Sequence, residues 1–251
     1  MKFINKNTIK LDKEINELDK FVFKFVKILQ KHTDYVIVGG YVPILLGRTK
    51  TTDEIDIFVK HLSKEKIDKF YHDIGKSYWS LNAKNSAYAH KLLMKDLAIR
   101  ISLKNTTTPN FKIKVARTKL EMANFVNKTK VITKLGAVYL SPLSVAIDFK
   151  RNYLKSYRDI EDAAYLEKIL AIKNQKANTN IINERLIPSR DRLKDRLNFV
   201  KYWANYVKTH SDKEWSKQQN VLINSLMQNA KNSKLTKEQY LRIKGGDDFI
   251  E

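Results

Sequence analysis

A short apolar run that ends in two consecutive glycines near residue 40 constrains the fold of this chain more than any other feature of its sequence. Tyr35-Val36-Ile37-Val38 is apolar and rich in β-branched residues, which is typical of a buried strand. Gly39 and Gly40 then allow a tight turn that most other residues resist. Residues 41–46 predict a short helix, because a proline such as Pro43 is tolerated in a first helical turn. The junction therefore predicts a strand, a turn and a helix whose first amides can approach a phosphate group.

Two carboxylates follow on the next predicted strand, residues 54–59. Side chains two positions apart on a strand point to the same side, so Glu54 and Asp56 would lie about 6 to 7 Å apart on one face. Mg²⁺ in phosphoryl-transfer sites is commonly bound by one or two carboxylates together with substrate phosphates. Taken alone, Gly-Gly is more often an ordinary turn, and an acidic pair is more often a solvated strand edge. Their combination predicts a metal and nucleotide site.

The remaining pattern predicts an α+β fold, with a small mixed sheet flanked by helices and a helical C-terminal part. Apolar spacing predicts an amphipathic helix over 18–29 and a helix over 63–75 with Ser63 as its N-cap. Alternation predicts strands over 97–103 and 111–115, separated by a polar turn at 105–110, and helices follow from 141 onward. We expect a core domain over 1–135 and a helical domain over 136–251. The Asn-rich stretch 174–183 is a further candidate boundary.

Composition narrows the class of protein. None of the 251 residues is a cysteine, which excludes disulfides, thiolate zinc sites and a cysteine nucleophile. The apolar runs are far shorter than the roughly 20 residues of a membrane span, and the N-terminus lacks a signal-peptide pattern. We therefore expect a soluble cytoplasmic protein with no membrane partner. The net charge of +21 favours a nucleic-acid partner, although Lys, Asn and Ile enrichment from AT-rich coding is the alternative explanation.

The order of these motifs resembles a known superfamily. A strand, Gly39-Gly40, a short helix, Arg48, Thr52 and the Glu54-Ile55-Asp56 strand are similar to the nucleotidyltransferases headed by DNA polymerase beta, particularly their small prokaryotic and archaeal AbiEii-like branch. The stretch from Ser141-Pro142-Leu143 to Lys150, and Tyr157-Arg158-Asp159-Ile160-Glu161-Asp162-Ala163, also resemble motifs of that branch. The resemblance spans roughly residues 18 to 170.

The resemblance implies nucleotidyl transfer, in which an acceptor oxygen attacks the α-phosphorus of a Mg²⁺-bound nucleoside triphosphate and pyrophosphate leaves. Mn²⁺ could replace Mg²⁺. Glu54 and Asp56 would bind the metal, and Lys150 would neutralise developing charge. The other residues implied to contact or orient the nucleotide are Gly39, Gly40, Tyr41, Arg48, Thr52, Arg158 and Asp159. The implied acceptor is an RNA, such as tRNA, or a protein hydroxyl. A toxin-like role with an antitoxin or other partner protein is also implied.

One departure from the superfamily pattern leaves an alternative open. A third carboxylate commonly lies on a later strand, but the candidate strands here carry Arg100, Lys112 and Lys114 instead. The alternative is therefore a catalytically degenerate protein that binds nucleic acid or a partner protein without turnover. A third hypothesis makes residues 181–244 a protein-interaction module.

Overall fold

The computed structural model describes residues 1–174 and 191–245. All but the first residue of the Asn-rich stretch 174–183 lie outside the described residues. Among the described residues, no helix combines the length and apolar character needed to cross a lipid bilayer.

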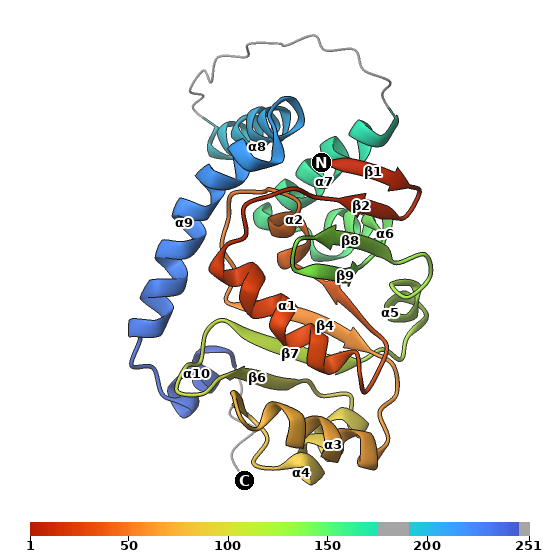
Figure 1. Ribbon diagram of the computed structural model, residues 1–251, viewed down its shortest axis with the longest axis vertical. Coiled ribbons are helices and arrows are strands. Elements are labelled where there is room, and N and C mark those ends of the chain that lie inside the picture. The colour runs from red at the N-terminus through yellow and green to blue at the C-terminus, as the bar shows by residue number, and fades with distance from the viewer. Residues whose placement is uncertain (175–190, 246–251) are drawn as a thin grey trace.

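A nine-stranded mixed sheet forms the centre of the molecule (Figure 1). Its strand order is β1-β2-β8-β9-β3-β4-β7-β6-β5. The strands are β1 (Lys2–Asn5), β2 (Thr8–Lys10), β3 (Tyr35–Val38), β4 (Glu54–Val59), β5 (Tyr78–Ser80), β6 (Ile99–Leu103), β7 (Asn110–Val115), β8 (Thr129–Thr133) and β9 (Gly136–Leu140). In the middle of the sheet, β4 is antiparallel to β3 and parallel to β7, so residues from three distant segments lie side by side.

Helices surround this sheet, and α9 runs along one side of the molecule from α8 to α10 (Figure 1). The helices are α1 (Glu17–Leu29), α2 (Tyr41–Leu45), α3 (Lys64–Ile74), α4 (Ser86–Met94), α5 (Lys119–Ala123), α6 (Leu143–Asp148), the π-helix η1 (Phe149–Leu154), α7 (Tyr157–Asn174), α8 (Arg192–Thr209), α9 (Asp212–Asn232) and α10 (Lys237–Ile243). Helix α1 begins at a capping box in which Asn16 accepts from the amide of Asp19 and the Asp19 carboxylate accepts in return.

Helix α1 packs on one face of the sheet and thereby fixes which β4 side chains face the other way. Phe21 and Phe25 stack on Phe111 of β7, with ring centroids 4.3 and 3.7 Å apart. Phe111 pairs with Ile55 across the strands, so the buried Ile55 and Ile57 belong to the same apolar layer. The alternation of β4 then places Glu54 and Asp56 on the opposite face.

The predicted mixed sheet and its flanking helices are confirmed, and the sheet is larger than expected. The strands that the sequence pattern missed, β1, β2, β5, β8 and β9, are each three to five residues long. The proposed division after residue 135 falls between β8 and β9, which pair antiparallel, so β9 belongs with the sheet and not with the helices that follow.

The C-terminal helices share the main core. Trp215 of α9 is fully buried, and the side chain of Gln219 donates to the carbonyl oxygens of Ile44 and Arg48 at 2.8 and 3.0 Å. Both N–H groups of the buried Gln219 amide thus have acceptors, which avoids the free-energy cost of burying unpaired polar groups. These two hydrogen bonds hold α9 against the end of α2 and the loop that follows it.

Candidate nucleotide site

The turn after β3 lies directly against Asp56. The cross-strand pair of Val38 and Asp56 brings the two segments together, and Gly39 has a φ of +71°. A Cβ atom at Gly39 would lie 2.5 Å from Oδ2 of Asp56, so glycine is required both by the backbone conformation and by the close approach. A Cβ atom at Gly40 would lie 3.2 Å from Oγ1 of Thr52. The two glycines predicted to line the site therefore contact the β4 region.

A cavity of about 430 Å³ opens beside Asp56. Its charged lining residues are Asp56, Lys112 and Lys114 from the sheet, Glu121 from α5 and Lys150 from η1. Its lining also includes the apolar residues Leu120, Val145, Ala146, Phe149 and Leu154. Ligand pockets typically combine an apolar wall with a few polar groups, at volumes of about 300 to 1,000 Å³. This cavity fits that description.

Asp56 lies among mixed charges at the edge of this cavity. Oδ1 of Asp56 lies 3.8 Å from Nζ of Lys112, its neighbour on β7, and 35% of the Asp56 side chain is exposed. No hydrogen bond to the Asp56 carboxylate is formed within the described part of the chain. Burial raises the pKa of Asp56 above its ordinary value; Lys112 opposes this shift, and the nearby Glu54 carboxylate adds to it.

Glu54 has three partners, of which Tyr240 lies in α10 and Lys244 directly follows this helix. Its Oε1 atom accepts hydrogen bonds from Arg100 and from the hydroxyl of Tyr240, the latter at 2.8 Å, and Nζ of Lys244 lies 3.4 Å away. Burial alone would raise the pKa of Glu54, but Arg100, Tyr240 and Lys244 together lower it below its ordinary value. The sequence pattern did not indicate Tyr240 and Lys244 as site residues, because they lie far from Glu54 in the chain.

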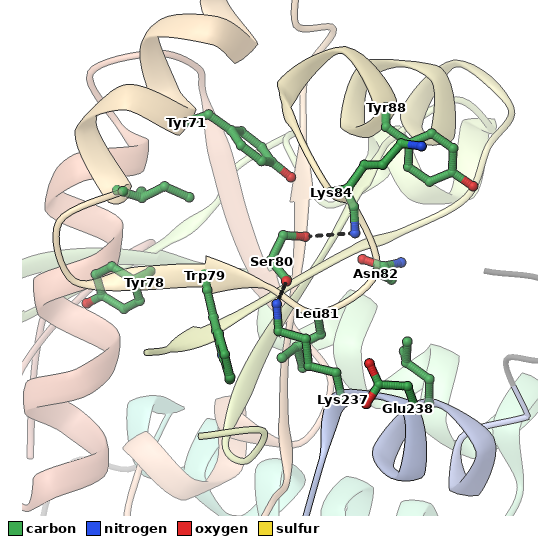
Figure 2. A pocket seen from close by; sticks show the side chains of 14 residues that line it. Tyr71, Tyr78, Trp79, Ser80, Leu81, Asn82, Lys84, Tyr88, Lys237 and Glu238 are labelled. Atoms are coloured by element: carbon green, nitrogen blue, oxygen red, sulfur yellow. Dashed lines mark hydrogen bonds between the residues drawn. The ribbon is translucent and has the colours of Figure 1, made fainter. Parts of the chain in front are cut away.

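Helix α10 is fixed to the sheet beside a second cavity, of about 520 Å³ (Figure 2). Nζ of Lys237 donates to the carbonyl oxygen of Ser80 at 2.8 Å and lies 4.0 Å from the centre of the Trp79 ring. Leu81, Tyr240 and Leu241 form a small apolar cluster that is separate from the main core. These contacts keep Tyr240 in reach of Glu54.

A cluster of buried ion pairs lies beyond the cavity, with Asp162 of α7 at its centre. The carboxylate of Asp162 pairs with Arg48, with Lys50 at 2.8 Å and with Lys150 at 2.9 Å. Glu161 binds Arg48 at 2.5 Å, and Lys150 also binds Asp159 at 3.1 Å. The cluster joins the loop after α2 to η1 and α7, and it contains three residues predicted for the nucleotide site.

Burial dominates the electrostatics of this cluster. Burial, followed by the neighbouring charges of Arg48 and Lys150, lowers the pKa of Lys50 to about 7. Burial also lowers the pKa of Lys150, against the opposing effect of Asp159. The three buried cations share three carboxylates, and Arg196 pairs with Glu161 as a further cation.

The structure brings together some of the predicted site residues and separates others. Gly39, Asp56 and Lys150 line the cavity. Thr52 lies beside Gly40, where its hydroxyl donates to the carbonyl oxygen of Glu54 at 2.8 Å.

The other predicted contacts lie elsewhere. Tyr41 is fully buried, and its hydroxyl donates to Asp19 at 2.8 Å, so it faces the core and not the cavity. Arg48 and Asp159 are engaged in the ion-pair cluster. Arg158 is exposed, and its carbonyl oxygen accepts from Arg48 at 3.5 Å.

The donor atoms near Asp56 fit a two-carboxylate Mg²⁺ or Mn²⁺ site poorly. A site with two carboxylates on β4 would have to include Glu54, which is not among the residues that line the cavity and whose Oε1 already has three cationic or hydroxyl partners. The position across from Asp56 on β7 carries Lys112, where a carboxylate would complete the site. In residues 1–174 and 191–245 there is no group of three or more His, Asp or Glu side chains arranged to hold a metal.

Similarity to known proteins is limited. Residues 185–248, which include α8, α9 and α10, match a family described as a family of unknown function (DUF8150). No curated protein matches the chain significantly. Among solved structures, the chain is similar to an antigenic nucleotidyltransferase-like protein from Paracoccidioides brasiliensis, with 16% identity and a TM-score of 0.39 over 77% of this chain and 92% of that one. A likeness of this size carries no argument about function.

Proposed function

We propose that this protein has a nucleotidyltransferase-type core that binds a nucleoside triphosphate in the cavity beside Asp56. The observation that carries the proposal is the close approach of Gly39 to Asp56, which forms one wall of a cavity that contains three lysines. A turn without side chains lets phosphate oxygens approach the backbone, and Lys112, Lys114 and Lys150 supply positive charge. The apolar residues that also line the cavity suit a nucleobase.

A cavity-filling substitution tests this location. Val145 lines the cavity, so we expect Val145→Trp to abolish calorimetric binding of ATP, GTP, CTP and UTP while the fold is retained. Val221→Trp is the matched control, because Val221 is 75% exposed on α9. If no triphosphate binds the wild type, or if Val145→Trp binds as well as the control, the proposed site is wrong.

The nucleotide would be transferred to the hydroxyl of an RNA or a protein in one form of this proposal, and merely bound in the other. The contacts of Gly39 with Asp56 and of Gly40 with Thr52 favour transfer, because they match the order of motifs that resembles nucleotidyltransferases. The three partners of Glu54 favour binding without turnover. Incorporation of label from α-phosphate-labelled triphosphates into RNA or protein, measured with and without Mg²⁺, separates the two. The AbiEii-like, toxin-related assignment and an antitoxin partner stay predictions.

We further propose single-stranded RNA as the partner, bound at the mouth of the cavity by residues 149–158, the rim segment. Tyr153 and Tyr157 are 61% and 64% exposed, and Phe149 stacks on Tyr153 with ring centroids 5.6 Å apart. Beside the buried Lys150, the rim segment carries three exposed basic residues, Arg151, Lys155 and Arg158, and it contains no acidic residue. Exposed aromatic rings beside basic side chains are the usual platform for single-stranded nucleic acid.

Fluorescence anisotropy with a labelled single-stranded RNA tests the rim segment. We expect the double variant Tyr153→Ala, Tyr157→Ala to bind RNA at least about tenfold more weakly than wild type, since stacking contributes about 1 to 3 kcal/mol per base. Tyr202→Ala is the control, because Tyr202 is an exposed aromatic residue on α8. Equal loss in both variants would contradict this assignment.

A further inference from the structure

Lys112 occupies the place where a metal-binding carboxylate would be expected. It lies directly across from Asp56 on the parallel strand β7, and Arg100 lies across from Lys112 on β6. Two neighbouring strands therefore present cations toward the carboxylates of β4. A divalent ion placed between Glu54 and Asp56 would be repelled by both, and it would have to displace Tyr240 from Glu54.

Of the three cavity lysines, Lys112 has the weakest partner. Lys114 pairs with Asp96 at 3.2 Å and with Glu121 at 3.0 Å, and Lys150 pairs with Asp159 and Asp162. Within the described residues, Lys112 has one ionic partner, Asp56, at 3.8 Å, which exceeds hydrogen-bond distance. Its side chain is 39% exposed. A half-exposed ammonium with one distant partner can turn toward an anionic ligand at little cost.

We propose that the cavity beside Asp56 binds the polyphosphate of a nucleotide without a divalent cation, and that Lys112 supplies the positive charge that a metal would otherwise provide. This inference rests on the proposed nucleotide site. It adds which group supplies the positive charge that balances the phosphates. Lys114 and Lys150 strengthen the field but stay attached to their carboxylates, so Lys112 is the group that determines affinity for phosphate.

Calorimetry of the wild-type chain with each of the four triphosphates and with inorganic tripolyphosphate, in excess EDTA and in excess Mg²⁺, tests the inference. We expect binding in EDTA that is at least as tight as binding in Mg²⁺, because Mg²⁺ reduces the charge of the ligand. Binding that requires Mg²⁺ would overturn the metal-free inference and leave the nucleotide site intact. The absence of binding in both conditions would overturn the nucleotide site itself, and the inference with it.

Two substitutions of Lys112 make the test sharper. Lys112→Met removes the charge, and we expect binding in EDTA to weaken at least about tenfold with no gain from Mg²⁺. Lys112→Asp restores a carboxylate beside Asp56, and we expect binding in EDTA to be lost and Mg²⁺ to recover part of it. Lys24→Asp, at an exposed position on α1, makes the same change of net charge and should leave binding unchanged.

Circular dichroism and thermal unfolding establish that each of these variants is folded. If Lys112→Met binds triphosphate in EDTA as tightly as wild type, or if Lys24→Asp weakens binding as much as Lys112→Asp does, the assignment to Lys112 is wrong.

Discussion

The hydroxyl of Tyr240 donates a hydrogen bond of 2.8 Å to Glu54, and this bond joins helix α10 to the central strand β4. The same hydroxyl accepts from Nδ2 of Asn110, at 2.6 Å, on the neighbouring strand β7. Lys244, one turn further along the chain, lies 3.4 Å from Glu54. Tyr240 of α10 and Lys244 just beyond it are thus two of the three partners of Glu54, and Arg100 of β6 is the third.

We predict that Tyr240→Phe lowers the free energy of unfolding by about 1 kcal/mol, because a half-buried carboxylate loses one of its donors. Urea unfolding at neutral pH measures the change. Tyr206→Phe is the control, since the Tyr206 hydroxyl accepts an exposed hydrogen bond from Gln218. An equal loss in the two variants would show that the Glu54 contact adds nothing to stability.

We predict that Gly39→Ala is more destabilising than Gly245→Ala. Both glycines have positive φ angles, +71° and +75°, so both substitutions cost about 1 to 2 kcal/mol for the left-handed backbone. Of the two, Gly39 faces a close neighbour, whereas no atom of the described residues lies within 4 Å of a Cβ at Gly245. We therefore expect Gly39→Ala to cost at least about 1 kcal/mol more.

The double variant Gly39→Ala, Asp56→Ala provides the internal check, because it removes the Asp56 oxygen that the new methyl group would meet. We expect its loss of stability to be smaller than the sum of the two single losses. Strict additivity in chemical denaturation would contradict the steric explanation.

We predict that Asp162→Asn costs about 3 to 5 kcal/mol, because it leaves Arg48, Lys50 and Lys150 buried around a neutral side chain. Asp68→Asn, at an exposed position on α3, should change the free energy of unfolding by less than about 0.5 kcal/mol. A loss below about 1 kcal/mol for Asp162→Asn would mean that water already compensates these cations.

We predict that stability rises with pH above neutrality. Lys50 has a folded pKa of about 7 against a usual 10.5, so the unfolded chain binds more protons between these values, and the folded state gains as pH increases. Denaturation measured from pH 7 to pH 9.5 checks the slope. Lys50→Met should reduce it without removing it, because burial also lowers the pKa of Lys150. Identical slopes in wild type and Lys50→Met would exclude Lys50 as the cause.

The sequence predicted the central part of the fold well because its signals are local. The strand, double glycine and short helix at 35–46, and the alternating strand at 54–59, are each determined by neighbouring residues. The strands β1, β2, β5, β8 and β9 were missed, because three to five residues give too little periodicity, and their pairing depends on partners far along the chain.

The site was predictable to the extent that it depends on local geometry. Gly39 and Asp56 meet because β3 and β4 pair antiparallel, with Val38 opposite Asp56. The alternation of apolar and polar residues over 111–115 indicated a strand with one solvent-exposed face. Lys112 and Lys114 lie on that face and line the cavity. No local signal could place Tyr240 on Glu54 or Asp162 on Arg48, since these contacts arise from tertiary packing.

The length of α9 has a consequence for relatives of this protein. Inserting one residue into a helix turns everything beyond it by about 100° and moves it by about 1.5 Å. Helix α9 extends from α8 to α10 and packs on α1, so such an insertion would carry Tyr240 away from β4 unless the short link at 233–236 absorbed it. A change in the length of α9 in a relative's sequence would therefore indicate that the residue equivalent to Tyr240 no longer reaches the β4 glutamate.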